Sequence, residues 1–415
     1  MPRILLIAAT TGYQTRAFAD AAHRLGIEVT LATDRCHVLE DPWRDRAIAI
    51  RFEDPEESAR RLTDIPDGIV AVADRSTSIA ALVAQRLGIA WHPPEAVALC
   101  RNKNLMRAAF QSAGLKTPHH FTVPLDSDQR EAVRTTYPCV LKPLGLSASR
   151  GVIRANDEAS FIEAFTEIRR ILNLPDIRRH HDEADRAIQI ESYISGKEFA
   201  LEGIMTDGEL QVLAIFDKPD PLEGPYFEET IYLTPSRESA STQQAIVETC
   251  LGAVRALGLA HGPIHAEMRV NSEGVFMLEI AARPIGGLCA RVLRFQPDLT
   301  LEELVILHAV GKMPADLLPV AAASGVMMIP VPGSGVLESV EGVDRARSIP
   351  LIIDIAITAK LGERLVPLPA GASYPGFIFA EGPDPFAVET ALRRAHAELR
   401  FHLLSALPTL APAAD

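Results

Sequence analysis

The sequence predicts a multidomain α/β protein, with α+β parts, that begins with a parallel sheet covered by helices. In the first 95 residues, short apolar runs alternate with amphipathic stretches, a pattern typical of consecutive βα units. We expect strands at residues 3–9, 28–32 and 69–73 and helices at 16–25 and 76–87. Each helix is followed by a glycine, Gly26 or Gly88, which commonly ends a helix. These units predict a Rossmann-like N-terminal domain over residues 1–95.

The length, composition and net charge of the chain limit its domain organisation and its partners. At 415 residues, 47% hydrophobic and 23% charged, the chain is long enough for several substantial cores. The formal charge of −13 excludes nucleic acid and anionic membranes as main partners, because both bind basic surfaces. No long apolar run and no leader-like segment occur, so we expect a cytoplasmic protein without a membrane segment.

The cysteines and one adjacent histidine pair are the candidates for a disulfide or zinc site. Five cysteines are scattered singly along the chain. Their odd number and their separation indicate reduced thiols rather than a disulfide framework or a zinc site. The adjacent His180 and His181 would make a poor chelate, so we interpret them as part of a charged surface loop.

Polar residues follow the predicted strands of the N-terminal domain, at the edge where open α/β sheets bind ligands. They are Thr10, Thr11 and Tyr13 after the first strand and Asp74-Arg75 after residues 69–73. Contact with a substrate and capping of turns would each explain them. The first loop lacks the G-x-G-x-x-G pattern, so no dinucleotide site is expected there.

The second unit, residues 96–188, carries two lysines in unusual places. Lys103 lies in the first turn of a predicted helix, where a cation opposes the helix dipole and indicates an anionic partner. Lys142 ends a predicted strand directly before Pro143. The loop that follows can lay backbone N–H groups on phosphates, although it lacks the order of a Walker loop; its candidate residues are Ser147, Ser149 and Gly151.

Residues 189–199 predict a strand, a turn and a second strand. The acidic Glu191 and Glu198 flank the apolar Tyr193-Ile194. An adenine slot with a ribose-binding carboxylate beyond it would need this arrangement. The segment therefore predicts part of a nucleotide site.

Two later stretches predict a functional loop and a third folding unit, without individual site residues. Residues 216–236 are rich in proline and glycine and contain Lys218, Glu228 and Glu229, so they resemble a functional loop more than a linker. Residues 313–404 form a third unit of short strands with a helix at 385–399. The tail at 405–415 is expected to be disordered.

The segment from Gly262 to Phe295 carries the most informative pattern of the chain. Its two apolar-rich runs, 264–270 and 275–280, flank a four-residue turn sequence that ends in Gly274. Such a pattern predicts a β-hairpin. If residues 272–274 form a three-residue loop closed by a bulge at Gly274, the two strands acquire a defined register.

That register places Glu267 directly opposite Glu279, with Cβ atoms about 5 Å apart, and carries the same face on to Arg283. Like charges in this arrangement destabilise a hairpin, so a compensating interaction is needed to explain the pair. A hard divalent cation held by carboxylate oxygens is the simplest, and Mg²⁺ binds in this way together with substrate phosphates. The alternative is a solvent-facing hairpin whose charged side chains are merely solvated.

Taken together, these pieces resemble the ATP-grasp superfamily of carboxylate–amine ligases in their order and spacing. The residues that carry the resemblance are Lys103, Lys142-Pro143, the 145–151 loop, Glu191-x-x-Ile194-x-x-x-Glu198, Glu267 and Glu279-x-x-x-Arg283. The third unit looks like the C-terminal domain of the L-amino-acid (dipeptide) ligase branch. The implied ATP-grasp architecture has a Rossmann-like domain at 1–95, a small lobe at 96–188, a large lobe with the metal and catalytic site at 189–312, and a C-terminal α+β domain at 313–404.

The resemblance also implies a role for each candidate residue. The nucleotide ATP would be held at its phosphates by Lys103, Lys142 and the loop with Ser147, Ser149 and Gly151, at adenine by Glu191 and the Ile194 backbone, and at the ribose by Glu198. Glu267 and Glu279 would hold Mg²⁺, with Mn²⁺ as a substitute, and Arg283 would stabilise developing negative charge. Many family members carry Asn where this chain has Ala281, which leaves the number of metal ions open.

The activity implied is ATP-dependent joining of a small carboxylate, such as an amino acid, to an amine through an acyl phosphate, giving an amide, ADP and phosphate. Two other classes stay open: an ATP-grasp carboxylase or purine-pathway ligase, and a non-catalytic ATP-binding protein. The intact Glu267, Glu279 and Arg283 speak against a mere binder. The expected partners are small molecules, and a homodimer is among the assemblies left open.

Overall fold

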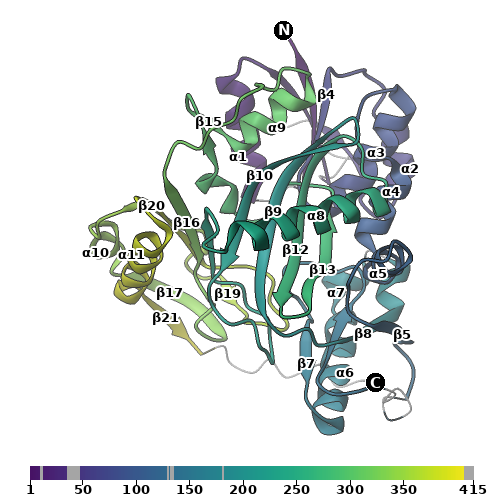
Figure 1. Ribbon diagram of the computed structural model, residues 1–415, viewed down its shortest axis with the longest axis vertical. Coiled ribbons are helices and arrows are strands. Elements are labelled where there is room, and N and C mark those ends of the chain that lie inside the picture. Colours follow the sequence, from purple (N-terminus) through teal and green to yellow (C-terminus); the bar gives the residue numbers. More distant parts are fainter. Residues whose placement is uncertain (10–12, 35–46, 129, 131–134, 180–181, 406–415) are drawn as a thin grey trace.

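The computed structural model (Figure 1) describes residues 1–9, 13–34, 47–128, 130, 135–179 and 182–405. The expectations for Thr10, Thr11, His180, His181 and the tail after Ser405 lie outside the described residues. Four of the five cysteines fall within them, and these four are free, as expected from the sequence. Among the described residues, no helix is long and apolar enough to cross a membrane.

The N-terminal domain is a parallel sheet between two layers of helices. Its strands lie in the order β3-β2-β1-β4 and are β1 (Arg3–Ile7), β2 (Glu28–Thr33), β3 (Ile48–Ala49) and β4 (Gly68–Ala71). Alternate residues of β1 enter different cores: Ile4 packs in the core that contains Phe18 of α1 (Tyr13–Arg24), and Leu5 in the core that contains Ile79 of α3 (Asp74–Leu87). Burial on both faces explains why β1 is apolar from Ile4 to Ile7. The short α2 (Pro55–Arg61) packs against α3.

The small lobe is a four-stranded antiparallel sheet backed by one long helix. Its strands lie in the order β5-β8-β6-β7 and are β5 (His120–Pro124), β6 (Cys139–Pro143), β7 (Ile153–Ala155) and β8 (Ala187–Ser192). The apolar face of α6 (Glu158–Leu172) forms the core of this lobe with the sheet. Helices α4 (Pro94–Arg101) and α5 (Lys103–Ser112) connect the lobe to the N-terminal domain, and α7 (Pro175–Arg178) and a 3₁₀ turn (Glu183–Arg186) follow α6.

The large lobe is built on an eight-stranded sheet in which all neighbouring strands are antiparallel. The order is β13-β12-β9-β10-β11-β16-β20-β18. These strands are β9 (Lys197–Thr206), β10 (Glu209–Lys218), β11 (Ile231–Thr234), β12 (Gly262–Asn271), β13 (Gly274–Ala281), β16 (Ala323–Met328), β18 (Ile352–Ile357) and β20 (Gly376–Gly382). The helix α8 (Ala240–Leu257) lies against β13, and β11 pairs with β16, so one sheet runs from the large lobe into the third unit.

The third unit completes the fold beside the last strands of this sheet (Figure 1). A small sheet in the order β19-β17-β21 contains β17 (Gly335–Glu341), β19 (Arg364–Leu365) and β21 (Arg400–Leu404). The helix α11 (Pro385–Glu398) packs on β16 and β20, with α10 (Val343–Arg347) beside it. Between the large lobe and this unit lie a 3₁₀ turn (Cys289–Val292), β14 (Arg294–Phe295), β15 (Leu299–Thr300) and α9 (Leu301–Ala309), which contacts α1.

Candidate active site

The four parts of the fold meet around a cavity of about 340 Å³. The N-terminal domain contributes Asp74, the small lobe Lys142, the large lobe Glu267, and the third unit Met328 and Tyr374. Because each part supplies lining residues, the cavity depends on their mutual packing. All predicted site residues line it except Gly151.

The β12–β13 hairpin brings the two predicted metal carboxylates face to face. Glu267 is paired with Glu279 in the register, which confirms the predicted juxtaposition. The predicted loop and bulge are wrong in detail: Asn271 pairs with Gly274, so the loop has two residues, and Leu278 is the extra residue in β13. Either arrangement adds one residue to β13 before Glu279, and the facing pair is therefore the same.

Glu279 is the more open member of this pair. Its side chain keeps 32% of its exposure, and its nearest charge is Lys103 Nζ, 3.8 Å from Oε2. Lys103 itself is held by Leu146, whose carbonyl oxygen accepts a hydrogen bond of 2.6 Å from Nζ. Among the described residues, no group donates a hydrogen bond to the Glu279 carboxylate, so its oxygens can take up a ligand.

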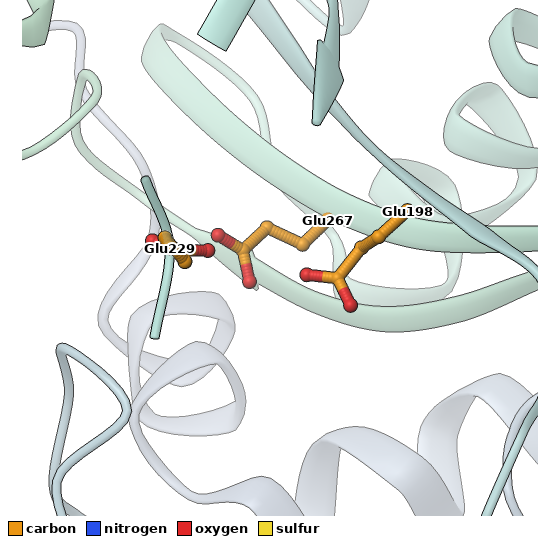
Figure 2. Close-up of side chains that lie close together, drawn as sticks. All are labelled: Glu198, Glu229 and Glu267. Atoms are coloured by element: carbon orange, nitrogen blue, oxygen red, sulfur yellow. The ribbon is translucent and has the colours of Figure 1, made fainter. Parts of the chain in front are cut away.

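Glu267 belongs to a buried cluster of charges around Lys218. Figure 2 shows the carboxyl groups of Glu198, Glu229 and Glu267, whose oxygens approach within 4.8 Å of one another. Lys218 Nζ lies 2.9 Å from Glu198 Oε1 and 3.1 Å from Glu267 Oε1, and it also donates to Glu229. The ammonium group therefore holds three carboxylates together at the floor of the cavity.

Two carboxyl groups of this cluster have pKa values that are shifted in opposite directions. Burial, followed by the neighbouring carboxylates, raises the pKa of Glu229 to about 7 despite Lys218. Burial would also raise the pKa of Glu267, but Lys218 and His265 hold that pKa well below its usual range. Of Glu229 and Glu267, Glu267 is therefore the one that stays ionised at neutral pH, as a metal ligand requires.

Glu191 does not present its carboxylate to the cavity as an adenine contact would. It is 2% exposed, with Lys142 Nζ 2.7 Å from Oε2, and Gln189 donates to Oε1. Arg107 Nε lies 2.9 Å from Oε1, at ion-pair distance but without the geometry of a hydrogen bond. The Glu191 side chain thus holds Lys142, and the chain from Glu191 to Ile194 lines the cavity.

Replacing Glu191 by glutamine is expected to lower the free energy of unfolding by about 3–5 kcal/mol at neutral pH, because Arg107 and Lys142 lose their buried counter-charge. Despite burial, these two cations lower the pKa of Glu191 to about 2. Its stabilising contribution is therefore complete above the unfolded pKa and is lost as the pH falls towards 2. Urea melts from about pH 7 to about pH 3 should show a shrinking difference from the parent protein.

The exposed Glu338, on β17, provides a matched control. Glu338→Gln should leave stability unchanged across the same pH range. A loss in Glu191→Gln that did not depend on pH would contradict an ionised Glu191.

Glu198 also lines the cavity, 9% exposed, and is fixed from two sides. Besides Lys218, Arg269 Nε donates to Glu198 Oε2 at 2.8 Å. Arg269 Nη1 donates to the Ile194 carbonyl oxygen at 2.7 Å. One buried arginine therefore sets the distance between the two residues predicted to contact ribose and adenine.

The 145–151 loop divides into a part that lines the cavity and a part that anchors it. Ser147, Ala148 and Ser149 line the cavity, and Ala148 and Ser149 have left-handed φ values of 55° and 53°. The Gly151 amide instead donates to the Pro369 carbonyl oxygen at 2.9 Å, so the structure does not place it toward a phosphate. Glycine is needed there because its φ is +73° and a Cβ atom would lie 2.7 Å from Pro143 Cγ.

The neighbour of Gly151 strengthens this anchor. Arg150 Nε donates to the Ala370 carbonyl oxygen at 2.9 Å, and Nη1 lies 2.9 Å from Asp176 Oδ2. We name residues 366–374, which follow β19, the C-terminal strap. The strap of the third unit thus holds the loop of the small lobe.

Arg283 lines the cavity just after β13 and is paired with the N-terminal domain. Its Nε and Nη2 donate to the two carboxylate oxygens of Asp74 at 2.8 and 3.1 Å, and Nη1 donates to the Pro284 carbonyl oxygen. Burial opposes the charge of Arg283, but Asp74 raises its pKa further above the ordinary value. The guanidinium is therefore a permanent cation with a fixed orientation.

Sequence reasoning assigned no role to Lys218, and it left Asp74 open between substrate contact and turn capping. Both belong to stretches that it marked as functional, the 216–236 loop and the polar turn after β4. A cation close to Glu228 and Glu229 in a loop rich in proline and glycine was the available signal for Lys218. The partner of Asp74 could not be read in this way, because Arg283 lies 209 residues further along the chain.

Three domain families match the chain in the order of its folding units. Residues 19–90 match the ATP-grasp N-terminal domain, residues 135–292 the ATP-grasp domain, and residues 327–403 the L-amino acid ligase C-terminal domain 2. The chain contains an ATP-grasp domain together with the matching N-terminal domain. The resemblance and the fold class inferred from the sequence are confirmed.

Solved ATP-grasp structures share the fold over nearly the whole chain. The L-amino acid ligase from Bacillus licheniformis has a TM-score of 0.79 and 25% identity, covering 98% of this chain and 99% of the ligase. The ATP complex of carboxyaminoimidazole ribonucleotide synthase from Aspergillus clavatus has a TM-score of 0.72 and 17% identity, covering 96% and 99%. At that identity, the second likeness concerns the ATP-grasp fold alone.

Among relatives in sequence, alanine–anticapsin ligase from Bacillus subtilis is 31% identical to this ATP-grasp protein over 225 residues. The match covers 50% of this chain and 46% of that ligase. The ATP-grasp protein described here therefore spans about half the length of this relative.

Proposed function

We propose that this ATP-grasp protein joins a small carboxylate, such as an amino acid, to an amine at the expense of ATP, through an acyl phosphate. The observation that carries the proposal is the composition of one cavity. It combines the facing carboxylates Glu267 and Glu279 with the cations Lys103, Lys142 and Arg283, and the buried Lys218 lies against Glu267. Two of the similar proteins are themselves named as ligases that act on amino acids.

The donor set fits Mg²⁺, with Mn²⁺ as a substitute. Glu267 and Glu279 offer carboxylate oxygens from neighbouring strands, and hard divalent cations prefer such ligands. Without a cation the two like charges destabilise each other, which favours a ligand between them. When bound, the ion would neutralise charge on the reacting phosphate.

The chain supplies fixed positive charge and backbone donors for a triphosphate. Lys142 is oriented by Glu191 and Lys103 by the Leu146 carbonyl, so neither ammonium group needs to reorganise on binding. The backbone around Ser147 and Ser149 would contact the phosphates, while Gly151 keeps the loop in place. Phosphoryl transfer requires mainly positioning and electrostatic stabilisation of this kind.

The adenosine part would lie between the small lobe and the large lobe. The Ile194 backbone would contact adenine and Glu198 the ribose, at the spacing that Arg269 fixes. Glu191 would contribute through its backbone, since its carboxylate is committed to Lys142.

Arg283 would stabilise the negative charge that develops when the amine attacks the acyl phosphate. Its guanidinium lies at the cavity and is oriented by Asp74 from the opposite domain. Donors held in place before the reaction stabilise an oxyanion at little cost in reorganisation. The amide, ADP and phosphate are the expected products.

A substrate panel tests the proposal. ATP and Mg²⁺ should release phosphate with amino acids and small carboxylates supplied in pairs, and ADP should form in equal amount. Hydroxylamine should trap the activated acid as a hydroxamate, because it attacks an acyl phosphate in place of the amine. AMP and pyrophosphate as products would contradict this mechanism.

A second candidate is a carboxylase or purine-pathway ligase, since an ATP-bound synthase of that kind shares the fold. It would require bicarbonate, biotin or a ribose phosphate in the same assay. A non-catalytic ATP-binding protein would release no phosphate with any pair. The homodimer stays a prediction, and the cytoplasmic location rests on the four free cysteines, which suit a reducing compartment.

A further inference from the structure

Glu202, on β9, is a buried carboxylate that lies outside the cavity lining. It is 0% exposed. A buried carboxylate is costly unless partners satisfy it. The partners of Glu202 therefore indicate what the charge is for.

One oxygen of Glu202 fixes the imidazole that contacts the metal carboxylate. Glu202 Oε2 lies 3.0 Å from His265 Nδ1, and His265 is its cross-strand neighbour on β12. His265 Nε2 lies 3.4 Å from Glu267 Oε1. The imidazole thus stands between two carboxylates and transmits the position of one to the other.

The other oxygen fixes the chain that follows Arg283. Glu202 Oε1 accepts a hydrogen bond of 2.9 Å from the Ile285 amide, two residues beyond Arg283. The Ile285 carbonyl oxygen accepts a hydrogen bond from Gln14 Nε2, which belongs to the N-terminal domain. Ile285 is therefore held from both the large lobe and the N-terminal domain, which fixes the backbone two residues beyond Arg283.

We propose that Glu202 is a positioning residue that keeps Glu267 and Arg283 in register with each other while contacting no substrate. This positioning role rests on the proposed ligase function. A metal carboxylate and an oxyanion donor must face the same reacting group, and misplacement by about 1 Å can cost a hundredfold in rate. Because the single Glu202 side chain binds both His265 and the Ile285 amide, Glu267 and Arg283 cannot move independently of each other.

Variants at Glu202 separate position from charge. Glu202→Met keeps the length and removes both acceptors, and we expect it to weaken Mn²⁺ binding to the ADP-loaded protein about 10- to 100-fold. Glu202→Gln should retain most of the affinity, since its amide oxygen can accept from Ile285 and its amide nitrogen can donate to His265 Nδ1. Electron paramagnetic resonance of free Mn²⁺ measures the affinity, and ADP binding in EDTA should be unchanged in both variants.

Glu302, on α9, is 6% exposed and provides a matched buried glutamate. Glu302→Met should leave Mn²⁺ affinity at the parent value. If Glu202→Met only lowered the melting temperature and matched this control in Mn²⁺ affinity, the proposal would be overturned. An equal loss in Glu202→Gln would also overturn it, because charge and not position would then be responsible.

If Glu202→Met does not fold, Glu202→Asp decides the question. It keeps the charge but is one methylene shorter and cannot reach both partners, so a similar loss of Mn²⁺ affinity is expected. Parent-like affinity in Glu202→Asp would refute the positioning role.

The binding measurement is independent of the ligase assay, because Mn²⁺ and ADP need no carboxylate or amine. A parent protein that turned over no substrate pair would refute the proposed function and leave the Mn²⁺ result interpretable. With an active pair, Glu202→Met at saturating Mn²⁺ should still have a kcat at least about tenfold below the parent, since the Arg283 segment has lost its support. A kcat restored fully by Mn²⁺ would overturn the link to Arg283.

Discussion

Glu279→Ala is expected to abolish turnover almost completely while leaving the nucleotide-free protein as stable as the parent or more stable. The side chain accepts no hydrogen bond among the described residues, and it faces the like charge of Glu267. Removing it relieves repulsion in the hairpin. Loss of a metal ligand should cost about 4 kcal/mol or more of transition-state stabilisation, roughly a thousandfold in rate.

Thermal melting without nucleotide and phosphate release with Mg²⁺ and ATP measure the two effects. Glu273→Ala, at the exposed tip of the same hairpin, is the control and should change neither. A large drop in melting temperature for Glu279→Ala would mean that Glu279 supports the fold, and the metal assignment would then fail.

Arg283→Lys should lower kcat by about 10²-fold or more and change nucleotide affinity little. A lysine keeps the charge, but it cannot make the paired hydrogen bonds to Asp74 that orient the guanidinium at the cavity. Steady-state rates together with calorimetric binding of the nucleotide distinguish transition-state stabilisation from ground-state binding.

The structure also supplies the competing explanation, in which Arg283 only joins two domains through Asp74. Under that explanation Arg283→Lys and Asp74→Asn would lose similar stability and retain kcat. If Arg283 acts in the reaction, the two variants share a stability loss, but Arg283→Lys loses far more kcat. Parent-like kcat in Arg283→Lys would end the catalytic assignment.

The sequence predicted local features well because they leave a periodic pattern. Apolar β1 and the glycines after its neighbouring helices gave the Rossmann-like domain, and alternation along β12 and β13 gave the pairing of Glu267 with Glu279. The bulge was misplaced because two arrangements give the same register from Glu279 onward. One has a three-residue loop, and the other has a two-residue loop with a bulge inside β13. The sequence pattern does not distinguish the two.

Contacts between distant segments were not predictable in this way. Lys218 and Glu267 are 49 residues apart, and Arg150 and Ala370 are 220 apart. Gly151 was assigned to phosphate because small loop residues commonly bind there, whereas its amide is used by the C-terminal strap. Such pairings depend on the packing of whole domains, and no periodicity within one element records them.

The C-terminal strap ties the small lobe to the third unit. The small-lobe sheet shares no strand with the eight-stranded sheet, so among the described residues a swing of the small lobe would disturb only one β-bridge, between Ile153 and Tyr226. It would, however, break the hydrogen bonds from Arg150 to Ala370 and from Gly151 to Pro369. At about 1 kcal/mol each, these two bonds make the open arrangement roughly 30-fold rarer than it would be without them. The last quarter of the chain thus opposes any swing of a loop encoded some two hundred residues earlier.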